Sequence, residues 1–308
     1  MGGGGGRDSY DVKIADLYDK MQRSASETEV KQFQTELAGY LGSLLTGYND
    51  RDTDAVNDHL KDISDCLAED LESTLELRFG GSVAKHTYVD GLSDVDALVL
   101  IDNSELEGKT PAQVKSYFHN KLSAYFKDVE VTEGRLAITM KFKDAEIQIL
   151  PALRDGDHYK IPNSEGEHWA RIRPRKFSEL LTKVNRDSGN KVVPTIKLAK
   201  AIIANLPERR QIKGYHAEAL GIEAFKNYNG SSNLPEMLTH YFKESSRRVL
   251  SPLRDKTGQS IHVDEYLGAE NSFERRLVSD SFSLAARRME FASAQRILSD
   301  WQTLFAEL

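Results

Sequence analysis

The sequence is poor in cysteine, tryptophan and proline, with one, two and eight of these residues among 308. The single cysteine, Cys66, excludes an internal disulfide and a cysteine-rich zinc site, and it fits a reducing cytoplasm. No apolar run approaches the roughly 18 residues that a membrane span needs. Met1 and the five glycines that follow it do not have the pattern of a signal peptide. We therefore expect a cytoplasmic protein without a membrane segment.

Charge and composition are those of an ordinary globular protein. Hydrophobic residues make up 39% of the chain and charged residues 29%, so the chain has enough apolar surface to form a core. Asp and Glu outnumber Lys and Arg by 48 to 41, for a net charge of −7. A surface of this balance offers no broad basic coat for long nucleic acid, so an anionic ligand must be bound at a local site.

The periodicity of apolar residues divides the chain into three stretches. Residues 1–8 have the composition of a flexible glycine-rich tail. Residues 9–170 combine an N-terminal helical spine, broken near residues 49–54, with a small α/β lobe, and residues 171–308 are almost entirely helical. We expect an α+β protein with a mixed-sheet lobe, a C-terminal helical lobe and a cleft between them. The expected strands span residues 75–79, 95–101, 135–142 and 145–150, and the later helices span residues 111–126, 174–185, 192–206, 215–227, 234–248 and 272–305.

A glycine-serine turn and a pair of aspartates form the most informative motif. Gly81 and Ser82 follow the first expected strand, where backbone N–H groups and a hydroxyl can face a phosphate. Asp94 and Asp96 stand two positions apart at the start of the next strand, so strand alternation places both carboxylates on one face. Two carboxylates so close repel each other unless a cation lies between them, and oxygen ligands favour Mg²⁺ or Mn²⁺.

Each half of this motif also has an ordinary explanation. A glycine-serine turn by itself is weak support for a phosphate site, and a lone Asp-x-Asp pair commonly does no more than solvate the end of a strand. Here the aspartate pair follows the turn by a dozen residues, between two expected strands. The combination favours a metal-assisted phosphate site over either ordinary explanation.

The segments GGSVAKHT, residues 80–87, and SDVDALVLI, residues 93–101, resemble the signature of the nucleotidyltransferase superfamily that includes DNA polymerase β. Within it the chain is most similar in style to bacterial CD-NTases, relatives of animal cyclic GMP-AMP synthase and of oligoadenylate synthases. The segment IKLAKAI, residues 196–202, resembles the family helix whose lysine binds the donor triphosphate. The segment KGYHAEAL, residues 213–220, resembles the helix that follows it, usually Lys-Ser-Tyr-x-x-Glu.

The resemblance implies a two-metal transfer of a nucleotide from a triphosphate. Asp94 and Asp96 would be catalytic metal ligands, holding Mg²⁺ or Mn²⁺ against the substrate. Lys85 and Thr87 match the family's turn after the Gly-Ser pair and would support it. The nucleotide-binding residues would be Gly81, Ser82, Lys200, Lys213 and Tyr215.

Two positions depart from the family pattern. The third metal ligand falls three residues before a Pro-Ala pair, where this chain has Gln148. An amide can offer a carbonyl oxygen to a metal, but it brings no charge and cannot act as a base. Glu146 lies on the same face of the expected strand, about 6–7 Å away, which is too far for a simple replacement. Gly214 replaces a serine that in relatives helps to hold the triphosphate.

These departures leave three interpretations of the chemistry open: an enzyme with altered metal coordination, a weak or partner-activated enzyme, and a nucleotide-binding protein without turnover. An engineered Gln148 that traps a substrate complex would give the same pattern.

We predict a bacterial anti-phage second-messenger synthase that joins ribonucleoside triphosphates, ATP among them, into a cyclic or linear oligonucleotide with release of pyrophosphate. The alternatives are a regulatory nucleotide-binding protein and a nucleotidyltransferase that acts on RNA or protein. An activating protein or ligand fits the family. The motifs do not determine base choice, ring size, linkage, oligomeric state, activator or effector.

Overall fold

The structure is a computed structural model that describes residues 7–49, 53–68, 74–79, 85, 87, 95–102, 106, 108–155, 158–163, 165–172, 174–255 and 262–306. For residues 7–26, 53, 74–79, 95–96, 102, 172 and 174–175 it describes the backbone alone. The helices are α1 (Arg7–Gly47), α2 (Thr53–Ala68), α4 (Pro111–Tyr125), α5 (Pro174–Asp187), α6 (Val192–Ala204), α7 (Gly214–Phe225), α8 (Leu234–Arg248), α9 (Phe273–Gln295) and α10 (Leu298–Thr303), with short 3-10 turns η1 (Glu208–Arg210) and η2 (Glu265–Leu267). The strands are β1 (Thr74–Phe79), β2 (Val95–Asp102), β3 (Glu130–Glu133), β4 (Ile138–Lys141), β5 (Glu146–Asp155), β6 (His158–Pro162) and β7 (Trp169–Ile172).

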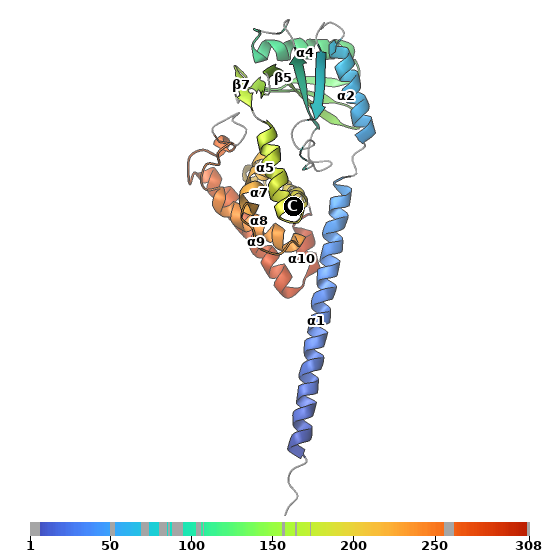
Figure 1. Ribbon diagram of the computed structural model, residues 1–308, viewed down its shortest axis with the longest axis vertical. Helices are drawn as coiled ribbons and strands as arrows, with labels where there is room; N and C mark the ends of the chain where they lie inside the picture. The colour runs from blue at the N-terminus through green and yellow to red at the C-terminus, as the bar shows by residue number, and fades with distance from the viewer. Residues whose placement is uncertain are drawn as a thin grey trace, which may run out of the picture.

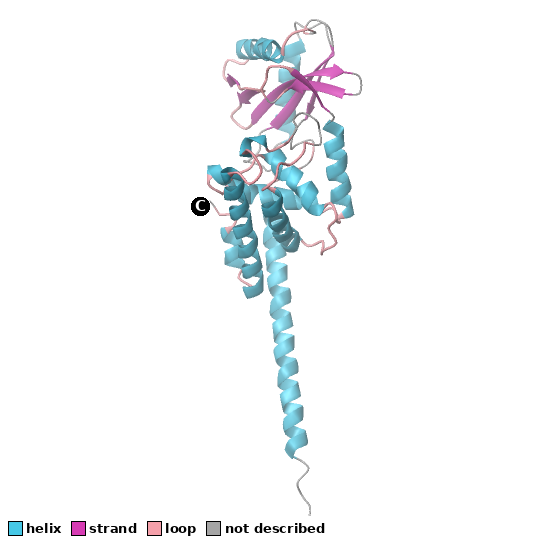
Figure 2. Cartoon of the chain, turned by 90° about the vertical axis from the view of Figure 1, so that its left-hand side faces the viewer, coloured by secondary structure: helices cyan, strands magenta, loops and turns pink. Residues whose placement is uncertain are grey.

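The strands form one mixed sheet around the long strand β5. The order is β1-β2-β5-β4-β3, and β2 and β5 run parallel while the other pairs are antiparallel. The second half of β5 pairs with β6, which in turn pairs with β7. The sheet lies at one end of the molecule and the helical lobe lies next to it, as Figures 1 and 2 show. The predicted α+β class, with a sheet lobe and a helical lobe, is confirmed.

Alternation along β2 and β5 separates the two faces of the sheet. One face packs its apolar side chains against α2 and α4, and these include Ala97, Val99, Ile101, Ile147 and Ile149. Cys66 of α2 is buried in the same core, as a small apolar residue of a helix. The other face carries a much smaller apolar cluster made by Leu100, Ala152 and Ile161. The face away from α2 and α4 therefore keeps room for polar residues such as Gln148.

The spine helix α1 belongs to the helical lobe by its packing. Its side chains Phe33, Leu37 and Leu41 are buried in the same core as α5 to α10, and the Tyr40 ring meets the Phe305 ring edge-on at 5.9 Å. The predicted division at residue 170 groups this spine with the sheet, whereas its described side chains pack on the helices beyond that point. In Figure 1 the first half of α1 extends well past both lobes.

Local signals set several helix boundaries. Thr110 caps α4 with a reciprocal pair of hydrogen bonds to Gln113, and Pro111 follows as the first helical residue. The predicted final helix, residues 272–305, is wrong as a single element, because Arg296 adopts a left-handed conformation with φ 59° and separates α9 from α10.

Three short strands were not predicted at all. β3 and β7 have four residues each and β6 has five. β6 pairs with the second half of β5, and β7 pairs with β6. Such pairing is not visible in local periodicity. Within the described ranges, no helix is both long enough and apolar enough to cross a membrane.

Candidate active site

The parallel pair β2 and β5 brings together two of the predicted catalytic positions. Asp96 on β2 stands in register with Gln148 on β5, which in turn faces Thr139 on β4. Register partners in neighbouring strands lie about 4.8 Å apart. Gln148 is half-buried between the fully buried Ile147 and Ile149, so its side chain lies on the face away from α2 and α4. The family resemblance predicted that Asp96 and the position of Gln148 lie close together, and the strand register places them next to each other.

Several predicted site residues lie outside what the structure describes. Gly81, Ser82 and Asp94 are not among the described residues, and Asp96 is described by its backbone alone. Among the described side chains, no group of three or more His, Cys, Asp or Glu could hold a metal ion. The aspartates and Gln148 together offer only oxygen donors, which suit Mg²⁺ or Mn²⁺. The oxygen ligands that Asp96 and Gln148 would supply at this position are therefore of the kind that Mg²⁺ or Mn²⁺ prefers.

A buried group of charges links the loop after β1 to the helical lobe. We call Lys85, Thr87, Lys200 and Glu218 the Glu218 cluster. The Nζ atom of Lys200 on α6 donates to Glu218 Oε1 on α7 at 2.7 Å and to the Thr87 carbonyl oxygen at 3.0 Å. The Lys85 ammonium and the Thr87 hydroxyl also donate to the Glu218 carboxylate. All four side chains are at most 10% exposed, and two lysines against one carboxylate leave the cluster one positive charge.

The cluster keeps Glu218 ionised. Burial by itself would raise the pKa of this carboxyl, but the charges of Lys85 and Lys200 and their hydrogen bonds outweigh it and hold the pKa below its usual value. One turn before Lys200 on α6, Lys197 has its pKa lowered to about 8 by burial and by the Lys200 charge. This end of α6 is thus a region of concentrated positive charge, which favours an anionic ligand nearby.

The start of α7 lies directly against this cluster. A Cβ atom added to Gly214 would stand 3.6 Å from the Cε and Nζ atoms of Lys200, an ordinary contact distance. Gly214, where relatives have a serine, therefore leaves space beside Lys200 that a small side chain could occupy without distorting the start of α7. The next residue, Tyr215, donates its hydroxyl to Asp255 at 2.9 Å and packs its ring against Phe177.

A second network, part exposed and part buried, holds Lys213 and the beginning of α7 from the other side. The Lys213 backbone N–H donates to the hydroxyl of Tyr266, which can then donate its own proton to His216 Nδ1, both at 3.0 Å. His216 is fully buried, and its Nε2 lies 3.7 Å from Asp264 Oδ2, too far for a hydrogen bond. Asp264 pairs instead with the buried Arg275 of α9 at 2.6 Å.

Arg275 also donates hydrogen bonds to the backbone of the segment that joins α8 to α9. Its guanidinium donates to the carbonyl oxygens of Val249, Asp264, Gly268 and Ala269. Five acceptors satisfy one buried cation, as burial of a charge requires. Arg275 thus fixes the segment between α8 and α9 that carries Asp264 and Tyr266.

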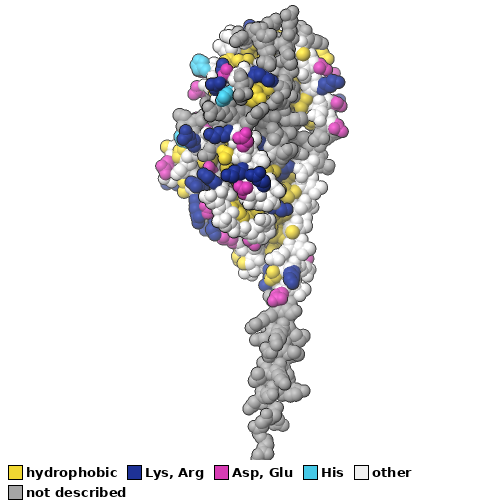
Figure 3. Space-filling model, viewed as in Figure 1, with side chains coloured by type: hydrophobic (Ala, Val, Ile, Leu, Met, Phe, Trp, Pro, Cys, Tyr) yellow, Lys and Arg dark blue, Asp and Glu magenta, His cyan; other side chains and the backbone are white. Residues whose placement is uncertain are grey.

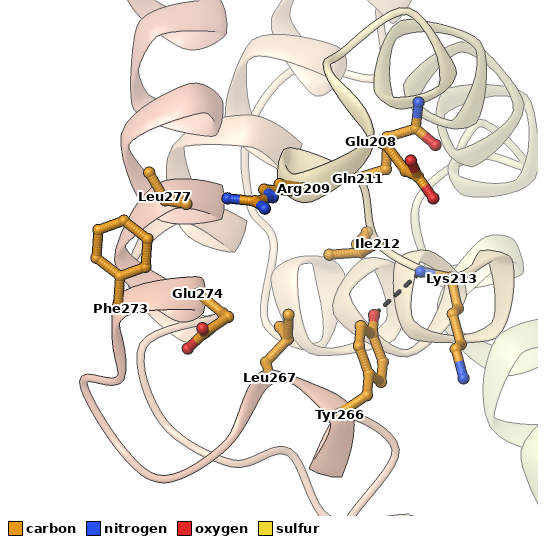
Figure 4. Close-up of a pocket in the computed structure, with 10 residues that line it drawn as sticks. All are labelled: Glu208, Arg209, Gln211, Ile212, Lys213, Tyr266, Leu267, Phe273, Glu274 and Leu277. Atoms are coloured by element: carbon orange, nitrogen blue, oxygen red, sulfur yellow. Dashed lines mark hydrogen bonds between the residues drawn. The ribbon is translucent and has the colours of Figure 1, made fainter.

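A hollow of about 700 Å³ opens beside this second network, as Figure 4 shows. Lys213 and Tyr266 line one side, joined by the hydrogen bond to the tyrosine hydroxyl, and the Lys213 ammonium lies 4.7 Å from the centre of the Tyr266 ring. Phe273 and Leu277 of α9 line the opposite side. The hollow includes Lys213 and does not include Lys200 or Tyr215, so it is not the whole of the predicted nucleotide site.

Sequence reasoning did not assign a role to Glu218, Tyr266 or Arg275. The signal for Glu218 was present, because it is the last residue of the Lys-Ser-Tyr-x-x-Glu pattern and lies one helical turn after Gly214. For Tyr266 no local signal exists, since its partners Lys213 and His216 lie 53 and 50 positions away. The partners of Arg275 lie nearer, within 26 positions, but no motif marks them.

The family model for the Second Messenger Oligonucleotide or Dinucleotide Synthetase domain matches residues 40–185, a range that contains both motif strands. Residues 40–185 are therefore similar to the synthetase domain of CD-NTases. No curated protein matches the chain.

Solved structures of CD-NTases share the fold of most of the chain. CdnG of Bradyrhizobium diazoefficiens in complex with GTP superposes with a TM-score of 0.68 and 14% identity, over 87% of this chain and 94% of CdnG. CdnC of E. coli MS115-1 with ATP gives a TM-score of 0.60 and 18% identity, over 91% and 92%. The cyclic AMP-GMP synthase DncV of Vibrio cholerae gives 0.62 and 9%, over 94% and 90%. The sheet lobe and the helical lobe therefore have the polymerase-β-like nucleotidyltransferase fold.

Proposed function

We propose that this chain is a metal-dependent synthase that joins ribonucleoside triphosphates into a cyclic or linear oligonucleotide and releases pyrophosphate. The match of residues 40–185 to the synthetase family model carries the proposal, because both motif strands lie within it. The anti-phage role belongs to the same proposal. An activating protein is part of it too, and a structure of E. coli MS115-1 CdnC with a HORMA protein, at 16% identity and a TM-score of 0.63, motivates its inclusion.

The triphosphate would be bound at the junction of α6 and α7. Lys200 and Lys213 stand on either side of Gly214, at the start of a helix whose positive dipole end favours an anion. The positive charge left over in the Glu218 cluster adds to this attraction. Tyr215 is fixed by Asp255 and Phe177, so its ring would offer a rigid surface beside the nucleotide.

Asp94, Asp96 and Gln148 would hold Mg²⁺ or Mn²⁺, which when bound would neutralise phosphate charge and lower the pKa of the attacking hydroxyl. In the transfer, the acceptor hydroxyl oxygen forms a bond to the donor's α-phosphorus. The bond from that phosphorus to the bridging β-phosphate oxygen breaks, pyrophosphate leaves, and the hydroxyl proton passes to water. The chain's own contribution is to orient the two reactants.

The direct test is product formation from labelled ATP, GTP, CTP and UTP with Mg²⁺ or Mn²⁺, followed by mass spectrometry. We expect a new phosphodiester product with the unaltered chain and none with Asp94→Asn, because that substitution removes a charged metal ligand. A lack of product under every nucleotide and metal combination, also with candidate activating proteins, would overturn the synthase proposal.

A second candidate function is nucleotide binding without turnover, favoured by Gln148 and Gly214. It predicts triphosphate affinity with no product in the same assay. A transferase that acts on RNA or protein is a weaker third candidate. On the face shown in Figure 3, the described Lys and Arg side chains are interspersed with Asp and Glu, whereas a long RNA favours a continuous basic surface.

A further inference from the structure

The contacts of Glu218 join segments that are far apart in the sequence. Glu218 lies on α7, Lys200 lies on α6, and Lys85 precedes Glu218 by 133 positions. Lys85 and Thr87 follow Gly81 and Ser82 within six residues. One buried carboxylate therefore connects the loop that carries the Gly-Ser pair to the lysine predicted to bind the triphosphate.

Stability is a poor explanation for this arrangement. A buried ion pair costs much of its attraction in desolvation, and apolar residues of similar volume commonly stabilise a core as well. What a carboxylate with three incoming donors provides is position. It fixes Lys200 Nζ between Glu218 and Thr87, and it fixes the Lys85 ammonium about 5 Å from the rings of Phe177 and Tyr215.

We infer that Glu218 is a positioning residue of the nucleotide site. It anchors the loop after β1 on the helical lobe and orients Lys200 toward the start of α7, so triphosphate binding depends on this carboxylate although it carries the wrong charge to touch phosphate. The inference rests on the proposed function, which places the triphosphate at this junction.

The sign of the effect separates positioning from simple electrostatics. Glu218→Gln removes a negative charge, so if the carboxylate only offset the lysines, affinity for a polyanion would rise. If it positions them, affinity falls. We expect the Kd for ATP with Ca²⁺, which limits turnover during the titration, to rise about tenfold, the loss of about one charge-assisted hydrogen bond.

A milder variant and a matched control accompany this test. Thr87→Val removes a hydroxyl that donates to Glu218 and accepts a long hydrogen bond from Lys200 at 3.4 Å, and it leaves the carboxylate in place, so a smaller loss of affinity is expected. The double variant should lose less than the sum of the two because both act through one cluster. Lys115→Met is the control. Lys115 is as buried as Lys200, at 8% exposure, but its ammonium donates to the Gly134 and Arg135 carbonyl oxygens in the sheet lobe. It should lower the melting temperature and leave the Kd unchanged.

Hydrogen exchange supplies a readout that needs neither nucleotide nor turnover. In Glu218→Gln the peptide containing Lys85 and Thr87 should exchange faster than in the unaltered chain, and in Lys115→Met it should not. A chain that makes no product would overturn the proposed function and leave both binding and exchange as tests of Glu218. An unchanged or lower Kd, additive losses in the double variant, or unchanged exchange would overturn the inference. If Glu218→Gln does not fold, an unchanged Kd in Thr87→Val overturns it.

Discussion

At the scale of single residues, the α6–α7 junction holds buried charged side chains, whereas the predicted metal site has a neutral amide. Lys200 and Glu218 are buried because each satisfies the other, and together with Lys85 they leave a positive charge at the α6–α7 junction. Gln148, in contrast, stands in register with Asp96 as a neutral amide where the family has a carboxylate. The roles of Asp94, Asp96, Gly81, Ser82, Lys213 and Tyr215 stay predictions, and Gln148 is the position where one substitution tests them most directly.

The prediction for Gln148 concerns metal binding and turnover. Gln148→Asp adds a charged oxygen ligand beside Asp96, so we expect turnover to rise by about tenfold or more and half-saturation to need less Mn²⁺ or Mg²⁺. Steady-state rates across a metal titration measure both.

Two comparisons complete this experiment. Glu146→Gln removes the neighbouring carboxylate of β5, and it should abolish the activity of the unaltered chain only if Glu146 reaches the metal through water. Equal rates in the unaltered chain, Gln148→Asp and Asp94→Asn would show that the metal assignment is wrong.

At the scale of elements, the packing of α6 on α7 determines where the Glu218 cluster lies. The two helices touch closely at Gly221, where an added Cβ atom would stand 2.6 Å from Ile196 Cδ1 and 2.7 Å from Ile196 Cγ1. Ile196 is fully buried, so it has no free space into which to move. The absence of a side chain at Gly221 therefore sets the distance between Lys200 and Glu218.

Gly221→Ala should destabilise the protein by about 1–3 kcal/mol, because the new methyl group overpacks the α6–α7 contact. The measurement is the free energy of unfolding by urea. Gly39→Ala is the matched control, since it lies within α1 with no atom within 4 Å of its added Cβ and should stabilise by about 0.5–1 kcal/mol. Equal effects of the two substitutions would contradict the packing argument.

At the scale of the whole molecule, two cores are joined by polar contacts. The sheet packs on α2 and α4, the helical lobe packs around α6 to α9 with part of α1, and the Glu218 cluster reaches from the loop after β1 into the helical core. A second polar centre, made by His216, Asp264, Tyr266 and Arg275, lies within the helical lobe. Its response to pH is a property of the whole fold.

Stability should fall as the pH drops from about 6.5 to 4. Burial lowers the pKa of His216 to about 4, the Asp264 charge opposes this shift, and Arg275 adds to it. The unfolded chain takes up the proton near pH 6.5, so the folded state is favoured in full above that pH and loses stability as the pH approaches 4. The expected loss is on the order of 3 kcal/mol.

The measurement is the free energy of unfolding at half-unit intervals between pH 4 and 7.5. His216→Asn keeps an acceptor for Tyr266 and removes the titrating ring, so its curve should be flatter in this window. Glu218 has a lowered pKa and contributes a further loss below its own usual range in both proteins. Parallel curves would mean that His216 does not titrate with the assumed shift.

The sequence alone was sufficient for the local features. Periodicity, with Pro111 near the first turn of α4, predicted α4 to α8 to within a few residues. The glycines after residue 79 marked the end of β1, and length with β-branching predicted β2. The glycine-serine turn, the Asp-x-Asp pair and the lysine of residues 196–202 were sufficient for the family, which the domain match confirms. These features depend on neighbours along the chain, so a reader of the sequence can see them.

The tertiary structure alone decided the rest. The pairing of β6 with β5 and of β7 with β6, the position of α1 in the helical core and the break at Arg296 depend on contacts or backbone conformations that no local pattern encodes. The same holds for Glu218, whose partners Lys85 and Thr87 lie 133 and 131 positions away. Burying a charge is favourable only when specific partners arrive from other segments, and their arrival is a property of the folded chain.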